Sequence, residues 1–394
     1  MKQQSVAILD IRSGSVTFAL GRKGVNDIFV LDAFHTENYD GYFVEGILDM
    51  ASFRHASLVS LNTVCQNYGG VIDEVYVSVP SPFIKLLTKG HTCCFAKNRK
   101  ISSQDVDKLY ESGLNELMVE DRCIHRSAMY FSLGDNRKYF TAESLCGMSS
   151  TLLKGALCYY FIAEEFYAAI SDILNGRNIS KVHFVPSTLA QATFLIPEKE
   201  REGYAFLLDI GFLTTSISVV YGNGIVHEES INCGTGTIQV ALMNELGVDY
   251  SIAEEILSDA NISGGIAAKE LVWASEMLNR QFSVQQINDI IKFNLDFMCE
   301  KIESFFTRYY KDKASTALTA NPINITGEGV SAIKGVAEHV AKRLNRLTQV
   351  VYPDQPYFDK PAYSSRISLL NAATSTKNVK KRGLLQGIFG GKRK

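Results

Sequence analysis

The sequence has little of what a disulfide-stabilised, metal-binding or membrane-spanning protein needs. Its eight cysteines form no CxxC pair and have no histidine cluster beside them, so the usual zinc-site spacing is missing. No stretch approaches the roughly 20 apolar residues of a spanning helix. The formal charge of -2, from 40 basic and 42 acidic residues, gives no field that favours nucleic acid as a partner. A globular protein with core cysteines in a reducing compartment is expected.

The N-terminal residues show no sign of a signal peptide. Met1–Gln4 lead directly into the apolar run Val6–Ile11, without a charged region and a small-residue cleavage site. We therefore expect a cytoplasmic protein whose contact with a membrane, if it has one, is at the surface.

The 394 residues, 46% of them hydrophobic, are enough for two lobes with their own cores. An apolar strand at Val6–Ile11, a Ser-Gly turn and a second strand at Val16–Leu20 predict a hairpin. The same order returns about 200 residues later, at Tyr204–Ile210 and Ser216–Val220. This internal echo, with helices between the strands, predicts an α/β protein built from two similar units.

Between Pro80 and Tyr160 the pattern changes to strands and polar turns. One helix is expected there, at Ser103–Asn115, because Ser102 and Asp105 form a capping signal. We interpret this stretch as an inserted subdomain.

Each of the two hairpins has an apolar strand that ends in an aspartate and a turn of small residues. The first turn is Asp10–Ser15 and the second is Asp209–Thr215. Backbone N–H groups in such turns bind phosphate oxygens, and an aspartate holds magnesium through water. A single turn of this kind is more often an ordinary hairpin, so the pair needs further support.

Two later segments supply it. The stretch Ile323–Gly335, INITGEGVSAIKG, resembles the adenosine-binding turn of the actin, Hsp70 and hexokinase superfamily, where glycines let an adenine approach the backbone. Pro361–Asn371, PAYSSRISLLN, looks like the final helix of that superfamily, which crosses the hinge between the lobes. The inserted subdomain, with Ile124-His125 and the turn Cys146–Met148, resembles the bacterial cell-division family FtsA and not the chaperones, the hexokinases or MreB.

The resemblance implies an α/β, actin-like two-lobed fold with an FtsA-type inserted subdomain. In that arrangement the first lobe has its core at 1–82 and 163–200 and its inserted subdomain (1C) at 83–162. The second lobe has its core at 201–232 and 301–373, with the hinge helix, and a small subdomain (2B) at 233–300. A linker at 374–379 and a basic tail at 380–394 complete the expected division.

The resemblance also implies ATP and Mg²⁺ as cofactors, with Mg²⁺ held through water by Asp10 and Asp209. No catalytic residue is assigned. The residues expected to bind the nucleotide are Asp10, Ser13, Gly14, Ser15, Asp209, Gly211, Thr214, Thr215, Gly234, Glu254, Gly327 and Gly329.

The chain departs from the superfamily pattern at the phosphate turns. Arg12 stands where the first turn usually has glycine, and Phe212 and Leu213 replace two glycines of the second turn. Leu257 occupies the place of a lysine expected beside the nucleotide. Large side chains where backbone must approach phosphate predict weak or no ATP hydrolysis.

The C-terminal residues combine seven basic residues with no acid from Thr376 onward. Between the two basic clusters lie Leu384, Leu385, Ile388 and Phe389, which would share one face of a helix, although the glycines favour disorder in solution. FtsA proteins end in a basic amphipathic helix of this kind. The residues expected to bind a membrane are Lys380, Lys381, Arg382, Leu384, Leu385, Ile388 and Phe389.

The resemblance implies an adaptor that polymerises and tethers the FtsZ ring to the cytoplasmic face of the membrane at the division site. Its partners would be the FtsZ C-terminal tail, bound by the small subdomain 233–300, other copies of itself, an anionic membrane surface and later division proteins. Two alternatives remain open from the sequence. One is a PilM-like adaptor of a pilus or secretion machine, and the other is an ATP-dependent enzyme related to sugar kinases.

Overall fold

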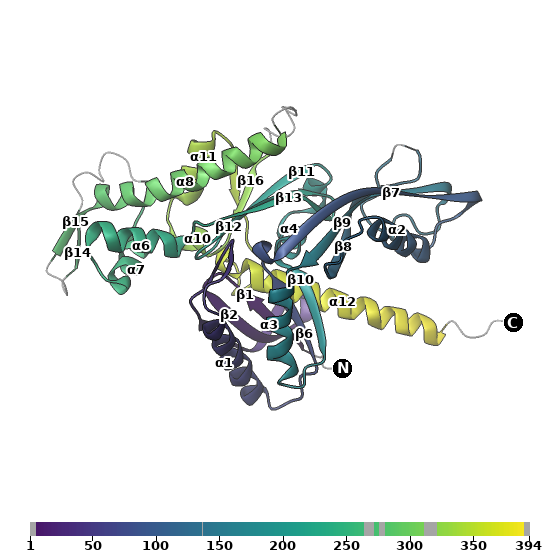
Figure 1. Cartoon of the computed structure of the whole chain (residues 1–394), viewed down its shortest axis with the longest axis horizontal. Coiled ribbons are helices and arrows are strands. Elements are labelled where there is room, and N and C mark those ends of the chain that lie inside the picture. The colour runs from purple at the N-terminus through teal and green to yellow at the C-terminus, as the bar shows by residue number, and fades with distance from the viewer. Residues whose placement is uncertain (1–4, 136, 264–271, 276–279, 311–320, 390–394) are drawn as a thin grey trace.

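A computed structural model describes residues 5–135, 137–263, 272–275, 280–310 and 321–389, with residues 377–389 described by their backbone alone. Two five-stranded sheets form the centre of the molecule (Figure 1). The first has the order β10 (Lys181–Pro186), β6 (Glu74–Val79), β1 (Val6–Ile11), β2 (Ser15–Lys23) and β3 (Phe29–Asn38). The second has the order β17 (Thr348–Val350), β16 (Ile323–Thr326), β11 (Tyr204–Ile210), β12 (Thr215–Tyr221) and β13 (Gly224–Ile231).

The two sheets have the same topology. In each, the central strand pairs in antiparallel fashion with the next strand of its hairpin and in parallel with a strand that follows a crossover. Asp10 and Asp209 therefore take equivalent places near the carboxyl ends of β1 and β11, directly before their turns. The internal echo in the sequence corresponds to a repeated architecture.

Helices cover both sheets. Because β1 and β11 are buried along almost their whole length, their runs are apolar without alternation, as expected for central strands with covered faces. The helices of the first lobe are α1 (Met50–Tyr68), α3 (Glu164–Asn175) and α4 (Ser187–Leu195), with α5 (Glu198–Arg201) leading to the second. Those that follow are α6 (Thr235–Leu246), α7 (Tyr250–Asp259), α8 (Val284–Tyr310), α10 (Glu328–Ala332) and α11 (Val336–Leu344). There are also two short antiparallel strand pairs, β4–β5 (Tyr42–Phe43 and Gly46–Ile47) and β14–β15 (Val272–Ser275 and Arg280–Ser283).

The stretch between Pro80 and Tyr160 is a separate three-stranded antiparallel sheet. Its order is β7 (Ile84–Lys100), β9 (Ser149–Ile162) and β8 (Cys123–Ser132), with α2 (Ser103–Asn115) packed on it. The sheet projects from the body on the side opposite β14 and β15 (Figure 1). Cys158 and Tyr160 at the end of β9 also belong to a core shared with β11 and β12. This stretch is thus attached to both lobes.

The helix α12 (Ser364–Phe389) begins at the hinge and leaves the body at its far end (Figure 1). Its first turns are buried against β1 and β2 through Ile367, Leu370 and Ala373. The backbone remains helical through 374–379, the residues expected to form a linker. Side chains of the predicted membrane-binding residues 380–389 lie outside the described side chains. Among the described residues, no helix is long and apolar enough to cross a membrane.

The capping signal before α2 is confirmed and is strengthened by an arginine. Asp105 accepts hydrogen bonds from the Ser102 backbone N–H at 2.9 Å and from Arg99 Nη1 at 2.9 Å. The Arg99 hydrogen bonds are the largest cause of a strongly lowered Asp105 pKa, to which the Ser102 backbone and hydroxyl add. The charged carboxylate is therefore the form that the folded subdomain stabilises.

We expect Asp105→Asn to lower the free energy of unfolding by about 1 kcal/mol at neutral pH, because the charged cap of α2 is lost. The folded pKa is depressed, so the wild-type contribution is complete above about pH 5 and disappears as the pH falls further. Thermal melts followed by circular dichroism from pH 7 downward should converge for the two proteins. Asp107→Asn, on the same helix but exposed in a pair with Arg126, is the matched control and should change little. An equal loss in both variants would contradict the role of the cap.

Candidate functional site

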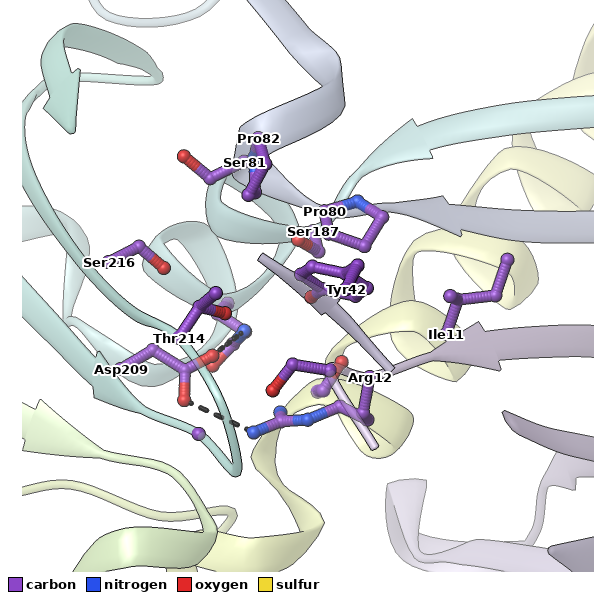
Figure 2. A pocket seen from close by; sticks show the side chains of 14 residues that line it. Ile11, Arg12, Tyr42, Pro80, Ser81, Pro82, Ser187, Asp209, Thr214 and Ser216 are labelled. Atoms are coloured by element: carbon purple, nitrogen blue, oxygen red, sulfur yellow. Dashed lines mark hydrogen bonds and ion pairs between the residues drawn. The ribbon is translucent and has the colours of Figure 1, made fainter. Parts of the chain in front are cut away.

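The turns after β1 and β11 meet directly across the boundary between the lobes. The Ser13 hydroxyl accepts a hydrogen bond from the backbone N–H of Leu213 at 2.9 Å. Arg12 Nη2 lies 3.3 Å from Asp209 Oδ1 (Figure 2). Both side chains are largely buried, with 11% and 15% of their surfaces exposed. The two aspartate-ending hairpins are thus close together, as their predicted relationship requires.

Each aspartate is already held by protein donors. Asp209 accepts from Arg12 through one oxygen and from Gln191 Nε2, on α4, through the other at 2.8 Å. Asp10 accepts from the Ser365 hydroxyl, in the first turn of α12, at 2.6 Å. The ends of β1 and β11 are consequently tied to the two helices that flank them.

Phe212 and Leu213 fill the space that glycines would leave. A Cβ atom added at Gly14 would lie 2.3 Å from Phe212 Cδ1, and one added at Gly236 would lie 2.7 Å from Phe212 Cζ. The Phe212 ring is therefore held between the first turn and the N-terminus of α6. Leu213 is buried and lies against Gly41, where an added Cβ would be 2.5 Å from Leu213 Cδ1. Glycine is required at these contacts because any side chain would collide with the ring or the leucine.

One cavity beside the turns, among the described residues, has a volume of about 20 Å³. Such a space holds roughly one water molecule, whereas sites for small-molecule ligands measure roughly 300–1,000 Å³. Figure 2 shows how closely its side chains approach one another. The lining residues are Ile11, Arg12, Ser13, Tyr42, Pro80, Ser81, Pro82, Ser187, Gln191, Asp209, Gly211, Thr214, Ser216 and Ser365.

Arg12 is the cation at the centre of a group of acids. Burial alone would lower the pKa of Arg12, but the negative charges of Asp209, Glu328 and Asp10 outweigh it and raise the pKa. Burial raises the pKa of Glu328, and the charges of Asp209 and Asp10 add to this increase while Arg12 opposes it. The guanidinium therefore stays charged and balances part of the acidic group.

The structure brings most of the predicted nucleotide-binding residues near this cavity. Asp10, Gly14 and Ser15 lie on the first hairpin, and Gly327 and Gly329 press against Asp209 and Ile210. In the second lobe, Thr215 donates to the Cys233 carbonyl, and Gly234 begins α6 against the backbone of Phe212. Glu254 is exposed on α7 and does not line the cavity.

Several residues at the cavity escaped the sequence reasoning. Gln191 and Ser365 belong to helices whose apolar periodicity gives no hint of a polar role, and Tyr42 lies in a short hairpin. A weak signal existed in the polar pair Ser364-Ser365 at the start of the predicted hinge helix. Their partners, Thr326 and Asp10, lie on different lobes, so only the three-dimensional structure could reveal the contacts.

The residues as arranged do not fit a nucleoside triphosphate with magnesium. Both Asp209 oxygens have protein donors, the Leu213 N–H is bonded to Ser13, and Phe212 lies on Gly14. Within the described residues, no group of three or more His, Cys, Asp or Glu side chains is placed to hold a metal ion.

Gly327 shows how tightly the predicted adenosine turn packs on β11. Its φ is +101°, and an added Cβ would lie 2.3 Å from Asp209 Oδ1 and 2.4 Å from the Ile210 carbonyl oxygen. We expect Gly327→Ala to lower the free energy of unfolding by roughly 3 kcal/mol, measured by chemical denaturation. Gly90→Ala, in the open on β7 with no atom within 4 Å of the added Cβ, is the control and should cost under about 1 kcal/mol. A mild effect at Gly327 would mean that the turn is looser than described.

Solved structures with the same fold are numerous. The PilM–PilN type IV pilus biogenesis complex contains a chain that is similar with a TM-score of 0.62 and 12% identity, over 94% of this chain and 98% of that chain. MreB 5 of Spiroplasma citri bound to AMPPNP gives a TM-score of 0.55 and 9% identity, over 97% and 100% of the two chains. The ethanolamine utilization protein EutJ from Carboxydothermus hydrogenoformans gives 0.51 and 11%, over 94% and 90%. At such low identities these similarities establish the fold alone.

Sequence comparison gives a narrower result. A search among curated proteins found no match. Residues 206–368, which run from β11 into the first turns of α12, match the family profile of "Cell division protein FtsA". The expected resemblance is thereby confirmed: the chain has the actin-like fold, and its second lobe carries the sequence pattern of the FtsA family over residues 206–368.

Proposed function

We propose that this protein is an actin-like adaptor of bacterial cell division that polymerises, binds FtsZ and attaches it to the cytoplasmic face of the membrane. The FtsA family match over residues 206–368 on an actin-like fold is the observation that carries the proposal. In this proposal the three-stranded sheet of β7, β8 and β9 would correspond to the FtsA-type inserted subdomain and would join protomers and later division proteins. For this proposal we keep the subdomain boundaries that were expected from the sequence.

A nucleotide has a limited part in this proposal. MreB 5 was solved bound to AMPPNP and to ADP, so the fold is one that holds nucleotides in other proteins. The resemblance assigns ATP with Mg²⁺ to the residues of the two turns, Gly327 and Gly329. In the described arrangement these residues are engaged with one another, and no step of the proposed function depends on hydrolysis.

The small subdomain of the second lobe offers a surface for the FtsZ tail. An open groove of about 680 Å³ runs between α6 and α8. Phe293, 76% exposed, and Ile290 give it an apolar side, and Glu245 and Asp289 give it negative charge. Such a groove suits a short peptide that presents an apolar anchor beside a basic residue.

We expect Phe293→Ala to weaken binding of an FtsZ C-terminal peptide at least tenfold, because an exposed aromatic anchor is removed from the groove. Fluorescence anisotropy with a labelled peptide measures the change. Phe34→Ala, on β3 of the first lobe and 55% exposed, is the matched control and should leave the affinity unchanged. If the two variants bind equally well, the groove between α6 and α8 is not the FtsZ site.

The far end of α12 would provide the membrane contact. The helix has 26 residues and spans about 39 Å, and its first turns are buried in the body. The basic cluster Lys380–Arg382 would contact anionic headgroups, and Leu384, Leu385, Ile388 and Phe389 would enter the acyl chains. One such helix binds weakly, whereas a filament that presents many of them binds by avidity.

We expect Phe389→Glu to reduce co-sedimentation with anionic vesicles by an order of magnitude or more, because a charge enters the apolar face. Gln386→Glu is the control. There the added charge stays in water and removes only about 1 kcal/mol of electrostatic attraction. Raising the salt concentration should weaken the electrostatic part and leave the apolar part. Equal losses in the two variants would mean that charge alone draws the tail to lipid.

A second candidate is an adaptor role in a pilus or secretion machine. The similarity to a chain of the PilM–PilN complex supports it. A fluorescent fusion of the full chain in dividing cells separates the two roles. Rings at mid-cell support the division adaptor, and polar foci would favour the pilus adaptor.

A further inference from the structure

The interlobe cleft, where the superfamily resemblance places a nucleotide, is occupied by side chains of this chain. We propose that Arg12, Phe212 and Leu213 form an internal latch that holds the two lobes together without nucleotide. The latch is defined by these three residues and by their partners Asp209 and Ser13. The inference rests on the geometry of the cleft and stands apart from the adaptor role.

The three residues of the latch are the ones that break the glycine pattern of the phosphate turns. Each makes a contact between different parts of the fold. Arg12 joins the first turn to Asp209 of the second lobe, and the Leu213 N–H joins the second turn to Ser13. The Phe212 ring lies against both Gly14 and Gly236. The Arg12 and Phe212 side chains, which stand at two of the departures, therefore both contribute contacts across the boundary between the lobes.

The charged residues of the latch provide attraction between the lobes, which a bound cation and phosphates would otherwise provide. Asp10, Asp209 and Glu328 place three carboxylates around the turns, and Arg12 lies among them. A guanidinium that bridges to a carboxylate of the other lobe supplies attraction across the boundary without an external ligand. The cavity beside these turns, about 20 Å³ in volume, is too small for a triphosphate.

Further contacts close the boundary around the latch. Tyr39 Oη donates to the Arg12 carbonyl oxygen at 2.8 Å, which fixes the turn that carries the guanidinium. Behind the turns, Thr326 of β16 donates to Ser364 at 2.7 Å, where α12 begins. Because Ser365 bonds to Asp10, consecutive residues of α12 touch both sheets. The lobes are thus held at the turns and at the hinge.

The first experiment measures the wild-type full chain with and without ATP and Mg²⁺. A ligand present at 100 times its Kd stabilises a protein by about 2.7 kcal/mol, which would raise the Tm by several degrees. We expect a Tm change below about 1 °C at roughly 1 mM ATP. Hydrogen exchange should already be slow in peptides covering residues 10–15 and 209–215 and should not change with ATP. A Tm rise of several degrees, or exchange that slows on adding ATP, would overturn the latch.

The second experiment opens the latch. Arg12→Ala leaves Asp209 with one donor fewer in a largely buried site, so we expect a Tm decrease on the order of 5 °C. Exchange of residues 209–215 should become at least tenfold faster. Arg22→Ala is the matched control, since Arg22 pairs with Asp32 at 3.1 Å on the exposed surface of the same lobe. It should lower the Tm by less than about 1 °C.

A direct rival assigns Arg12 to a phosphate of a bound nucleotide. That rival predicts that the wild type binds a fluorescent ATP analogue and that Arg12→Ala binds it more weakly. The latch predicts no measurable binding by the wild type. If Arg12→Ala and Arg22→Ala have equal effects on the Tm and on exchange, the ion pair does not hold the lobes. Were Arg12→Ala to fail to fold, the wild-type measurements would still decide between the two.

Discussion

The ion pair between Arg12 and Asp209 joins the turns that end the central strands of the two sheets. Its position follows from the repeated topology, because equivalent strands carry equivalent turns to the same boundary. Gln191 of α4 and Ser365 of α12 hold the two aspartates from either side. This small group of polar contacts lies where the two turns, α4 and the start of α12 meet, and it joins the two lobes inside an otherwise apolar centre.

In this fold, a turn after a central strand can bind phosphate or can pack against other parts of the protein. The turns bind phosphate where glycines leave the backbone open, and they pack where side chains are large. With Phe212 between Gly14 and Gly236, the second turn has become part of the packing. Gly14 of the first turn and Gly236 of α6 leave the space that the ring occupies. A glycine at such a turn can therefore indicate either phosphate binding or close packing against a large side chain.

Much of the fold could be predicted because its signals are local. The apolar runs of β1 and β11 and the capping box of α2 depend on residues near one another in sequence. The contacts of the cleft could not be predicted in this way. Arg12 and Asp209 are 197 positions apart, and nothing near either residue identifies the other as its partner.

The helical backbone over 374–379 likewise depends on residues outside that stretch. The polar composition of these residues predicted a linker, but they follow turns of α12 that are fixed by Ile367, Leu370 and Ala373. Once a helix is anchored, adding a residue costs far less than starting a new helix, so the backbone continues beyond its buried part. Local composition did not indicate that the backbone of these residues is helical.

The course of α12 has a mechanical consequence. Its first two residues are hydrogen-bonded to Thr326 of one sheet and to Asp10 of the other, and its far end stands clear of the body (Figure 1). The helix therefore joins both sheets at its first turn and extends away from them as one element. A force applied along α12 would reach the two sheets at the same place, through neighbouring residues of one turn.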